Sequence, residues 1–148
     1  MKKRPLILTL AMLFLAVPLV QADSHGGGDH DHTELEDQMS AMNKAWRSIR
    51  RQIKDPAKNA STIKLVQKVK VAAEKSAKLT PILANDLKGA EKKKFMAGYQ
   101  KGMKHTVALI GDLEAALKAG DNKGAEAIVG KLNDARKKGH ENYKPEDD

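Results

Sequence analysis

Two side chains near opposite ends of the sequence have the chemistry to bind a transition metal together. Met39 carries a soft thioether and His140 an imidazole, and both fall on apolar stripes of predicted helices. A buried thioether facing a buried imidazole across one end of a helical bundle is the axial pair that haem iron accepts in six-coordinate electron carriers. Spacing alone leaves ordinary roles open. An inward methionine also fills a core, and a histidine near a helix end is also a cation that suits the helix C-terminus.

The first of these side chains must be positioned by a helix that begins at Thr33 and ends at Lys54-Asp55-Pro56. Thr33 and Glu36 form a capping-box pattern, in which two side chains satisfy amides at a helix start. Large or apolar side chains follow at helical spacing, at Leu35, Met39, Met42, Trp46, Ile49 and Ile53. This stripe predicts an amphipathic helix with Met39 near its start.

Three further amphipathic segments follow. The second runs from an Asn59 cap to Thr80-Pro81, where proline disfavours helix in the preceding residue. After a connection over 81–89, the third spans about 90–119, and the last runs from about Lys123 to near Pro145. The expected stripes contain Ile63, Val66, Val69, Ala73 and Ala77, then Phe95, Tyr99, Met103, Thr106, Ile110, Leu113 and Leu117, then Ala125, Ile128, Leu132, Arg136, His140 and Tyr143.

The fold class follows from these segments and their short connections. No alternating apolar run is long enough for a strand. Short connections make consecutive helices antiparallel, so the sequence predicts an all-α, up-down-up-down four-helix bundle. Its core is thin, because the chain after Ala22 contains only four aromatic side chains and the second and fourth stripes are rich in alanine and glycine. Close packing of small residues and a cavity filled by a bound apolar group both remain open.

The N-terminal region has the composition of a targeting segment. Residues 1–22 combine three basic residues, an apolar run and a small-x-small site ending at Ala22, which predicts an export signal peptide cleaved there. The apolar run is too short for a typical membrane span, and no comparable run follows, so we expect no span after cleavage. Residues 23–32, rich in His and Gly, are predicted to be a flexible leader before a helical domain over 33–148.

Composition excludes several classes of function. The 148 residues contain no cysteine, which excludes disulfides, thiolate zinc sites, iron–sulfur clusters and covalently attached haem. Cleavage after Ala22 leaves 24 basic and 19 acidic side chains, a net charge of +5. Because these charges alternate along the chain, nucleic-acid binding is not expected. The sequence has no glycine-rich phosphate loop and no carboxylate pair beside a convergent base, so it is not predicted to be an enzyme.

Four segments together resemble the soluble cytochrome b562 family. Residues 35–43, Leu-Glu-Asp-Gln-Met-Ser-Ala-Met-Asn, are similar to the family's opening, and residues 132–143 resemble its closing segment, with Arg136 four before His140 and Tyr143 three after it. Residues 94–99 look like its Phe-x-x-Gly-aromatic element, and Thr80-Pro81 like its second connection. The resemblance covers about 34–144. Gly139 departs from it, because relatives commonly carry a larger residue or a cysteine there.

The resemblance implies one non-covalent haem b per chain, with Met39 and His140 as its axial ligands. It also implies that Met42, Phe95 and Tyr99 contact the macrocycle and that Arg136 lies beside the haem edge. Other roles compete with these: Arg136 as a snorkelling surface side chain, and Phe95 and Tyr99 as ordinary core. Met103 and His105 are the competing ligands, although His105 falls off the main stripe of its helix.

A haem iron held by both ligands has no vacant position, so the resemblance implies a periplasmic electron carrier rather than an enzyme, with an unidentified redox partner. Lys-rich faces would attract an acidic partner, although they also suit plain solvated surface. The alternative function is a haem-free exported bundle that binds divalent metal or a partner through its leader. The potential metal ligands of that leader are His25, Asp29, His30, Asp31 and His32.

Overall fold

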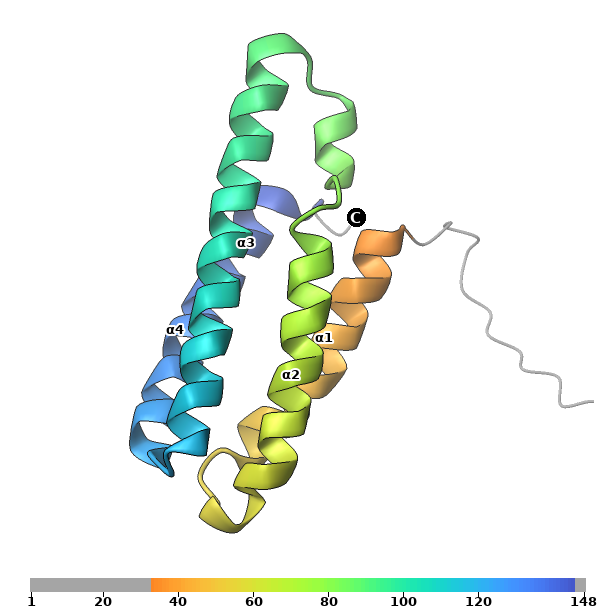
Figure 1. Cartoon of the computed structure of the whole chain (residues 1–148). Coiled ribbons are helices and arrows are strands. Elements are labelled where there is room, and N and C mark those ends of the chain that lie inside the picture. The colour runs from red at the N-terminus through yellow and green to blue at the C-terminus, as the bar shows by residue number, and fades with distance from the viewer. Residues whose placement is uncertain (1–32, 146–148) are drawn as a thin grey trace, which may run out of the picture. The chain divides into compact units, whose positions relative to one another are not determined.

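The computed structural model describes residues 33–145, which belong to one compact unit (Figure 1). The predicted signal peptide, the His-rich leader and the acidic tail at 146–148 lie outside the described residues. So do all five candidate metal ligands of the leader. The description that follows therefore concerns the helical domain alone.

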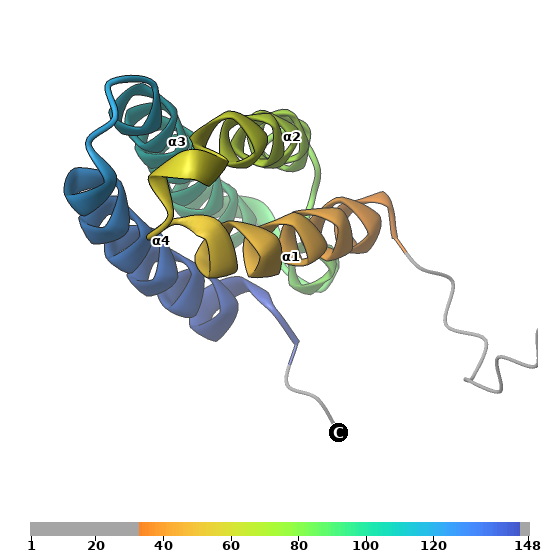
Figure 2. The ribbon, with the colours of Figure 1, turned by 90° about the horizontal axis from the view of Figure 1, so that it is seen from below.

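The described residues form an antiparallel four-helix bundle without strands, which confirms the predicted fold class. Figure 2 shows the helices nearly end-on, with α2 and α3 on one side of the bundle and α1 and α4 on the other. Two short 3-10 helices lie in the connections. The elements are α1 Glu34–Gln52, η1 Pro56–Lys58, α2 Asn59–Ser76, η2 Ile82–Asn85, α3 Gly89–Lys118 and α4 Asn122–Tyr143.

Helix α1 starts as the sequence predicts. The Glu36 amide donates to the Thr33 hydroxyl, 3.3 Å away, and the Thr33 amide donates to the Glu36 carboxylate over 2.7 Å, which completes the capping box. Three acidic residues in the first turn suit the positive end of the helix dipole. The start of the helix that carries Met39 is therefore fixed by local chemistry.

The predicted Asn59 cap of α2 is wrong. Asp55 instead caps η1, accepting from the Ala57 amide at 3.1 Å, and η1 runs directly into α2. Asn59 is the first residue of α2 itself, and its side chain turns toward α4. Asp55, four residues before Asn59, therefore provides the N-cap, and it does so for η1.

The turn between α3 and α4 lies where the sequence predicts it. Gly120 has φ +73°, the left-handed conformation that commonly ends a helix and that glycine adopts without strain. Asp121 then caps α4 by accepting from the Gly124 amide at 2.8 Å. This tight turn makes α3 and α4 antiparallel neighbours.

The core is sealed toward one end of the bundle and incomplete toward the other. Near the α3–α4 turn, Ile49, Leu113 and Ala125 are completely buried. Toward the start of α1 and the end of α4, apolar side chains are only half-buried and pack on the edge of this core. The half-buried group consists of Leu35, Met39, Met42, Phe95, Met96 and Tyr143. The bundle therefore leaves apolar surface partly exposed at the end where Met39 and His140 lie.

An asparagine pair closes the sealed end. Asn59 Nδ2 donates to Asn122 Oδ1 at 3.0 Å, and Asn122 Nδ2 donates back to Asn59 Oδ1 at 2.9 Å. Asn122 Nδ2 also donates to the Ile53 carbonyl at 2.9 Å, and Asn59 Nδ2 lies 3.5 Å from the Leu117 carbonyl. These partly buried bonds join residues at the ends of all four helices.

We expect Asn122→Ala to lower the free energy of unfolding by about 2 kcal/mol, because it removes three partly buried hydrogen bonds, two of them to the Asn59 side chain. Urea denaturation monitored by circular dichroism measures this loss. Asn142→Ala is the matched control, since the Asn142 side chain donates to the Lys138 carbonyl on the exposed surface. Equal stability losses in the two variants would contradict a special role for the asparagine pair.

Candidate functional site

The seam between α1 and α4 is the open side of the bundle. Each pair of helices consecutive in the chain packs closely, whereas α1 and α4 are not among the closely packed pairs. Figure 2 shows α1 and α4 together on one side of the bundle. Met39 lies on α1 and His140 on α4, so the two predicted ligands belong to the two helices that border this seam.

Two side-chain contacts show how α1, and the turn residue Lys54 that follows it, lie alongside α4. Lys54 Nζ lies 3.1 Å from Glu126 Oε1, and Trp46 Nε1 donates to Asn133 Oδ1 at 3.2 Å. In antiparallel helices the residue numbers of level partners have a constant sum, and these pairs give 180 and 179. Met39 and His140 also sum to 179.

The same register can be expressed as helical turns. Met39 precedes Trp46 by seven residues, and His140 follows Asn133 by seven. Seven residues make about two turns and advance roughly 10.5 Å along a helix, so each side chain returns to nearly the same face. The two proposed ligands are therefore level with each other, on the faces that the tryptophan and asparagine already bring together.

The exposure of the two ligands differs from the sequence prediction. Met39 and Met42 are half-buried, but His140 and Arg136 are exposed, so the prediction of a buried imidazole is wrong for this structure. The sequence prediction traced the fourth apolar stripe in four-residue steps, from Ile128 through Leu132 and Arg136 to His140. Each such step overshoots a full turn by about 40°. By His140 the stripe has rotated by about 120°, out of the core and toward the rim of the seam.

On α3, the predicted contact residues Phe95 and Tyr99 lie against the last turn of α4. The Tyr143 ring packs edge-to-face on both, with centroid distances of 5.1 Å to Phe95 and 5.4 Å to Tyr99. Gly98 permits this approach, because a Cβ there would lie 2.7 Å from the Tyr143 hydroxyl. At Gly139, by contrast, an added Cβ would meet no atom within 4 Å. The space that a side chain at residue 139 would occupy is therefore open.

Tyr99 ties this aromatic cluster to α2. It is 3% exposed, and its hydroxyl donates to the Ser76 carbonyl at 2.7 Å. Burial raises the pKa of Tyr99 to about 12, because the charged phenolate is poorly solvated there. The side chain is thus held neutral, with its ring packed edge-to-face with that of Tyr143.

We expect Tyr99→Phe to lower the free energy of unfolding by about 1 kcal/mol at neutral pH, through loss of the hydrogen bond to Ser76. The native state holds the Tyr99 proton more strongly than the unfolded chain, whose tyrosines ionise near pH 10. The contribution of this raised pKa is therefore complete below pH 10 and is lost as pH rises through about 12. Stability curves of both proteins from pH 7 to 12 test this. A constant stability difference above pH 10 would contradict it.

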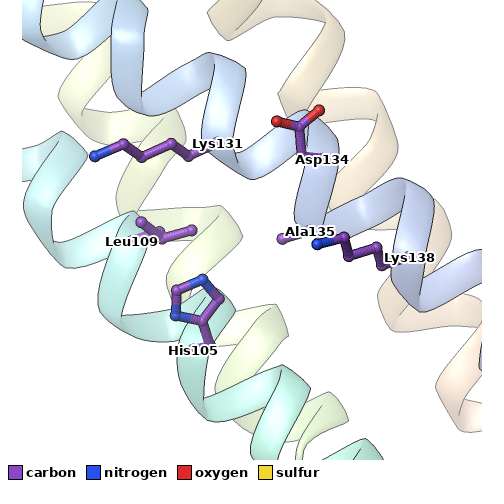
Figure 3. A pocket seen from close by; sticks show the side chains of 6 residues that line it. All are labelled: His105, Leu109, Lys131, Asp134, Ala135 and Lys138. Carbon is purple, nitrogen blue, oxygen red and sulfur yellow. The ribbon is translucent and has the colours of Figure 1, made fainter.

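Two surface grooves in the described part of the chain lie apart from the seam residues. One, of about 340 Å³ between α3 and α4, is lined by His105, Leu109, Lys131, Asp134, Ala135 and Lys138 (Figure 3). The other lies between α2 and α3, and its lining includes Glu74, Lys78 and Lys104. Neither groove includes Met39 or His140 in its lining. His105 is exposed, as expected for a residue off the main stripe, and Met103 is buried in the core.

A comparison with models of protein families identifies the family of this chain. The model for cytochrome b562 matches residues 34–144, from the first residue of α1 to the residue after α4. The chain belongs to the cytochrome b562 family. This confirms the resemblance and its extent. The family consists of haem b proteins that carry electrons and are not typically enzymes. No curated protein sequence matches the chain.

The side chains along the α1–α4 seam of this cytochrome b562 family member are of the types that bind haem b. The seam offers a thioether and an imidazole at one level, with partly exposed apolar side chains beside them. Within residues 33–145, no group of three or more His, Asp or Glu side chains is arranged to hold a bare metal ion. In the same range, no helix is long and apolar enough to cross a membrane.

Sequence reasoning missed one side chain of the seam. Asn133 was read only as part of the closing segment, yet it is the α4 partner of Trp46. Its position seven residues before His140 was the available signal, because a heptad spacing places two side chains on one face. Tyr143 was placed correctly on the apolar stripe, but its contacts with Phe95 and Tyr99 were not foreseen.

Proposed function

We propose that this chain is a periplasmic b-type cytochrome that transfers single electrons through one non-covalently bound, six-coordinate haem b. In this proposal residues 1–22 are a signal peptide removed after Ala22, residues 23–32 a leader, and residues 33–148 the haem-binding domain. Met39 and His140 are the axial ligands. The observation that carries the proposal is the shared register of the α1–α4 seam, in which Met39 is level with His140.

Each remaining site residue has a role that its surroundings support. Met42 lies one turn from Met39 on α1 and is half-buried, so it offers a flexible apolar contact. Phe95 and Tyr99 offer ring surfaces on α3. Arg136 is one turn before His140 and exposed, so its guanidinium suits the carboxylates at a haem edge.

Haem bound between these side chains supplies a one-electron iron couple. Methionine ligation raises the reduction potential relative to a pair of histidines, because the soft thioether favours Fe(II). With Met39 and His140 both bound to the iron, no vacant position would remain there for oxygen or a substrate. The proposed role is therefore electron transfer without catalysis.

The charge of the bundle favours an acidic redox partner, whose identity is open. Residues 33–145 carry 24 basic and 13 acidic side chains, a formal net charge of +11. Lys131 and Lys138 flank the groove in Figure 3, where Asp134 is the single acidic side chain of the lining. Such a surface attracts an acidic protein over long range and does so less at high salt.

The test is an optical titration of the mature protein with haem, scanned in the oxidised and dithionite-reduced forms. We expect saturation at one equivalent, with sharp low-spin bands on reduction. Met39→Ala should keep the fold and bind haem, but lose the low-spin reduced spectrum because one axial position becomes vacant. Met96→Ala, which removes another half-buried thioether, is the control and should keep that spectrum. An unchanged Met39→Ala spectrum, or no stoichiometric binding by the wild type, would refute the proposal.

A further inference from the structure

Four methionines belong to the described helices, and their burial differs. Met103 lies in the core and is 9% exposed, whereas Met39, Met42 and Met96 are half-buried. The three half-buried thioethers belong to the apolar side chains that pack on the edge of the core, toward the start of α1 and the end of α4. A small reagent in water therefore reaches part of their surface while the protein stays folded.

Met39 and Met42 lie on the helix that borders the open seam. They are three residues apart on α1, so they share one face of the helix and lie about one turn from each other. Trp46, about one turn after Met42, is the first residue of α1 that is buried. The complete cover of the core therefore begins only beyond the two thioethers.

A thioether reacts with a peroxide without help from the protein. The sulfur atom gives two electrons to the O–O bond and takes one oxygen atom, so that hydrogen peroxide leaves as water and an alkyl hydroperoxide as the alcohol. Methionine becomes methionine sulfoxide, and no further reductant or oxidant is consumed. The product is polar, and methionine sulfoxide reductases convert it back to the thioether.

Oxidation changes the property of Met39 on which its proposed role depends. The thioether offers two lone pairs of a soft sulfur atom to iron. In the sulfoxide, one of these pairs has formed the bond to oxygen, and the oxygen withdraws electron density from the sulfur. The sulfoxide sulfur is therefore a poor ligand. Conversely, a thioether bound to iron has its donor pair engaged, so ligation and oxidation compete for one sulfur atom.

We infer that Met39 is a site of reversible sulfoxidation in the haem-free protein, and that its oxidation prevents methionine ligation of haem. The second part rests on the proposed function, whereas the first part does not require haem. Met103 is not such a site, because the core shields its sulfur. A chain that meets peroxide before haem is thus blocked at one ligand while its fold is retained.

The first measurement follows oxidation of the haem-free protein by hydrogen peroxide at neutral pH. Fragment-ion mass spectrometry of proteolytic peptides separates Met39 from Met42 and gives the rate at each sulfur. We expect Met39 to react at least about five-fold faster than Met103 in the folded protein, because Met103 reacts only after the core opens. In concentrated urea all four methionines should react at similar rates. Equal rates at Met39 and Met103 in the folded protein would overturn the inference.

The second measurement adds haem after the peroxide has been removed. We expect the low-spin reduced spectrum to be lost in proportion to the fraction of chains oxidised at Met39, with the far-ultraviolet circular dichroism retained. Methionine sulfoxide reductases specific for the two sulfoxide epimers should restore the spectrum. A complete low-spin reduced spectrum from chains oxidised at Met39 would overturn the inference.

Two variants separate Met39 from the other half-buried thioethers. Met96→Leu removes a thioether outside the proposed ligand set, and peroxide should still abolish its low-spin reduced spectrum. Met42→Leu, compared with its own untreated form, should show the same loss. If either substitution makes the spectrum resistant to peroxide while Met39 is oxidised, the sensitive sulfur is not that of Met39 and the inference is wrong.

The two measurements separate the inference from the proposed function. If the untreated wild type takes up no haem, or binds it without methionine ligation, the proposed function fails and the second part of the inference fails with it. The oxidation rates then still decide whether Met39 is the modification site. If the untreated wild type shows methionine ligation and chains oxidised at Met39 show it equally, the inference fails alone.

Discussion

His140→Ala is expected to reduce haem affinity by at least about 100-fold. Removing a residue that only hydrogen-bonds to a metal ligand already costs up to about 100-fold, and removing the ligand itself should cost at least as much. His140 is the nitrogen ligand in the proposed site, and it is exposed on the rim of the seam. Replacing it therefore removes the iron–imidazole bond without opening a cavity in the core. The haem-free variant should melt close to the wild type. Haem titration followed in the Soret region measures the affinity.

His105→Ala is the matched control for this prediction. His105 is also an exposed histidine, but it lies on α3 and lines the groove between α3 and α4. Its removal should leave haem affinity and the reduced spectrum unchanged. If His105→Ala loses haem and His140→Ala keeps it, the ligand has been assigned to the wrong helix. Imidazole added to His140→Ala should restore part of the low-spin spectrum by occupying the vacated position.

Leu113→Ala is expected to have the largest effect on stability, about 3 kcal/mol in the free energy of unfolding. Leu113 is 0% exposed and lies in the core cluster at the sealed end of the bundle. Truncation there loses buried apolar surface and leaves a cavity that four packed helices close only in part. Urea unfolding followed by Trp46 fluorescence and by circular dichroism gives the loss from the shift in midpoint.

Leu35→Ala supplies the comparison at the other end. Leu35 is only half-buried, so its truncation in the haem-free protein should lower the free energy of unfolding by about 1 kcal/mol or less. The contrast tests whether the core is sealed near the α3–α4 turn and incomplete near the start of α1. Equal losses for Leu35→Ala and Leu113→Ala would contradict this description.

Local sequence patterns were sufficient to predict most of the fold. Thr33 with Glu36, and Gly120 with Asp121, act within one turn of chain, so their patterns identify the start of α1 and the α3–α4 turn. Asn59 failed as a cap because its best partner, Asn122, is 63 residues away. No local pattern separates a capping asparagine from one that pairs across the bundle.

The site was predictable in its ligand types and less so in its geometry. Met39 and His140 were placed on apolar stripes from spacing and from resemblance to the family, and that ligand assignment stays a prediction. The exposure of His140 was missed because four-residue steps accumulate rotation along a helix. The Trp46–Asn133 bond was missed because it depends on the register of two helices that are distant in the chain.

The heptad spacing along the seam makes this domain far more sensitive to insertions and deletions than to substitutions. One residue inserted between Met39 and Trp46 would rotate Met39 by about 100° relative to the indole and turn it away from the seam. The same holds for one residue removed between Asn133 and His140. Seven residues added to each segment would restore both faces and lengthen the bundle by about 10.5 Å. Many side chains between these anchor points can change, but the six residues of each segment tolerate a change in number only by whole heptads made in both helices.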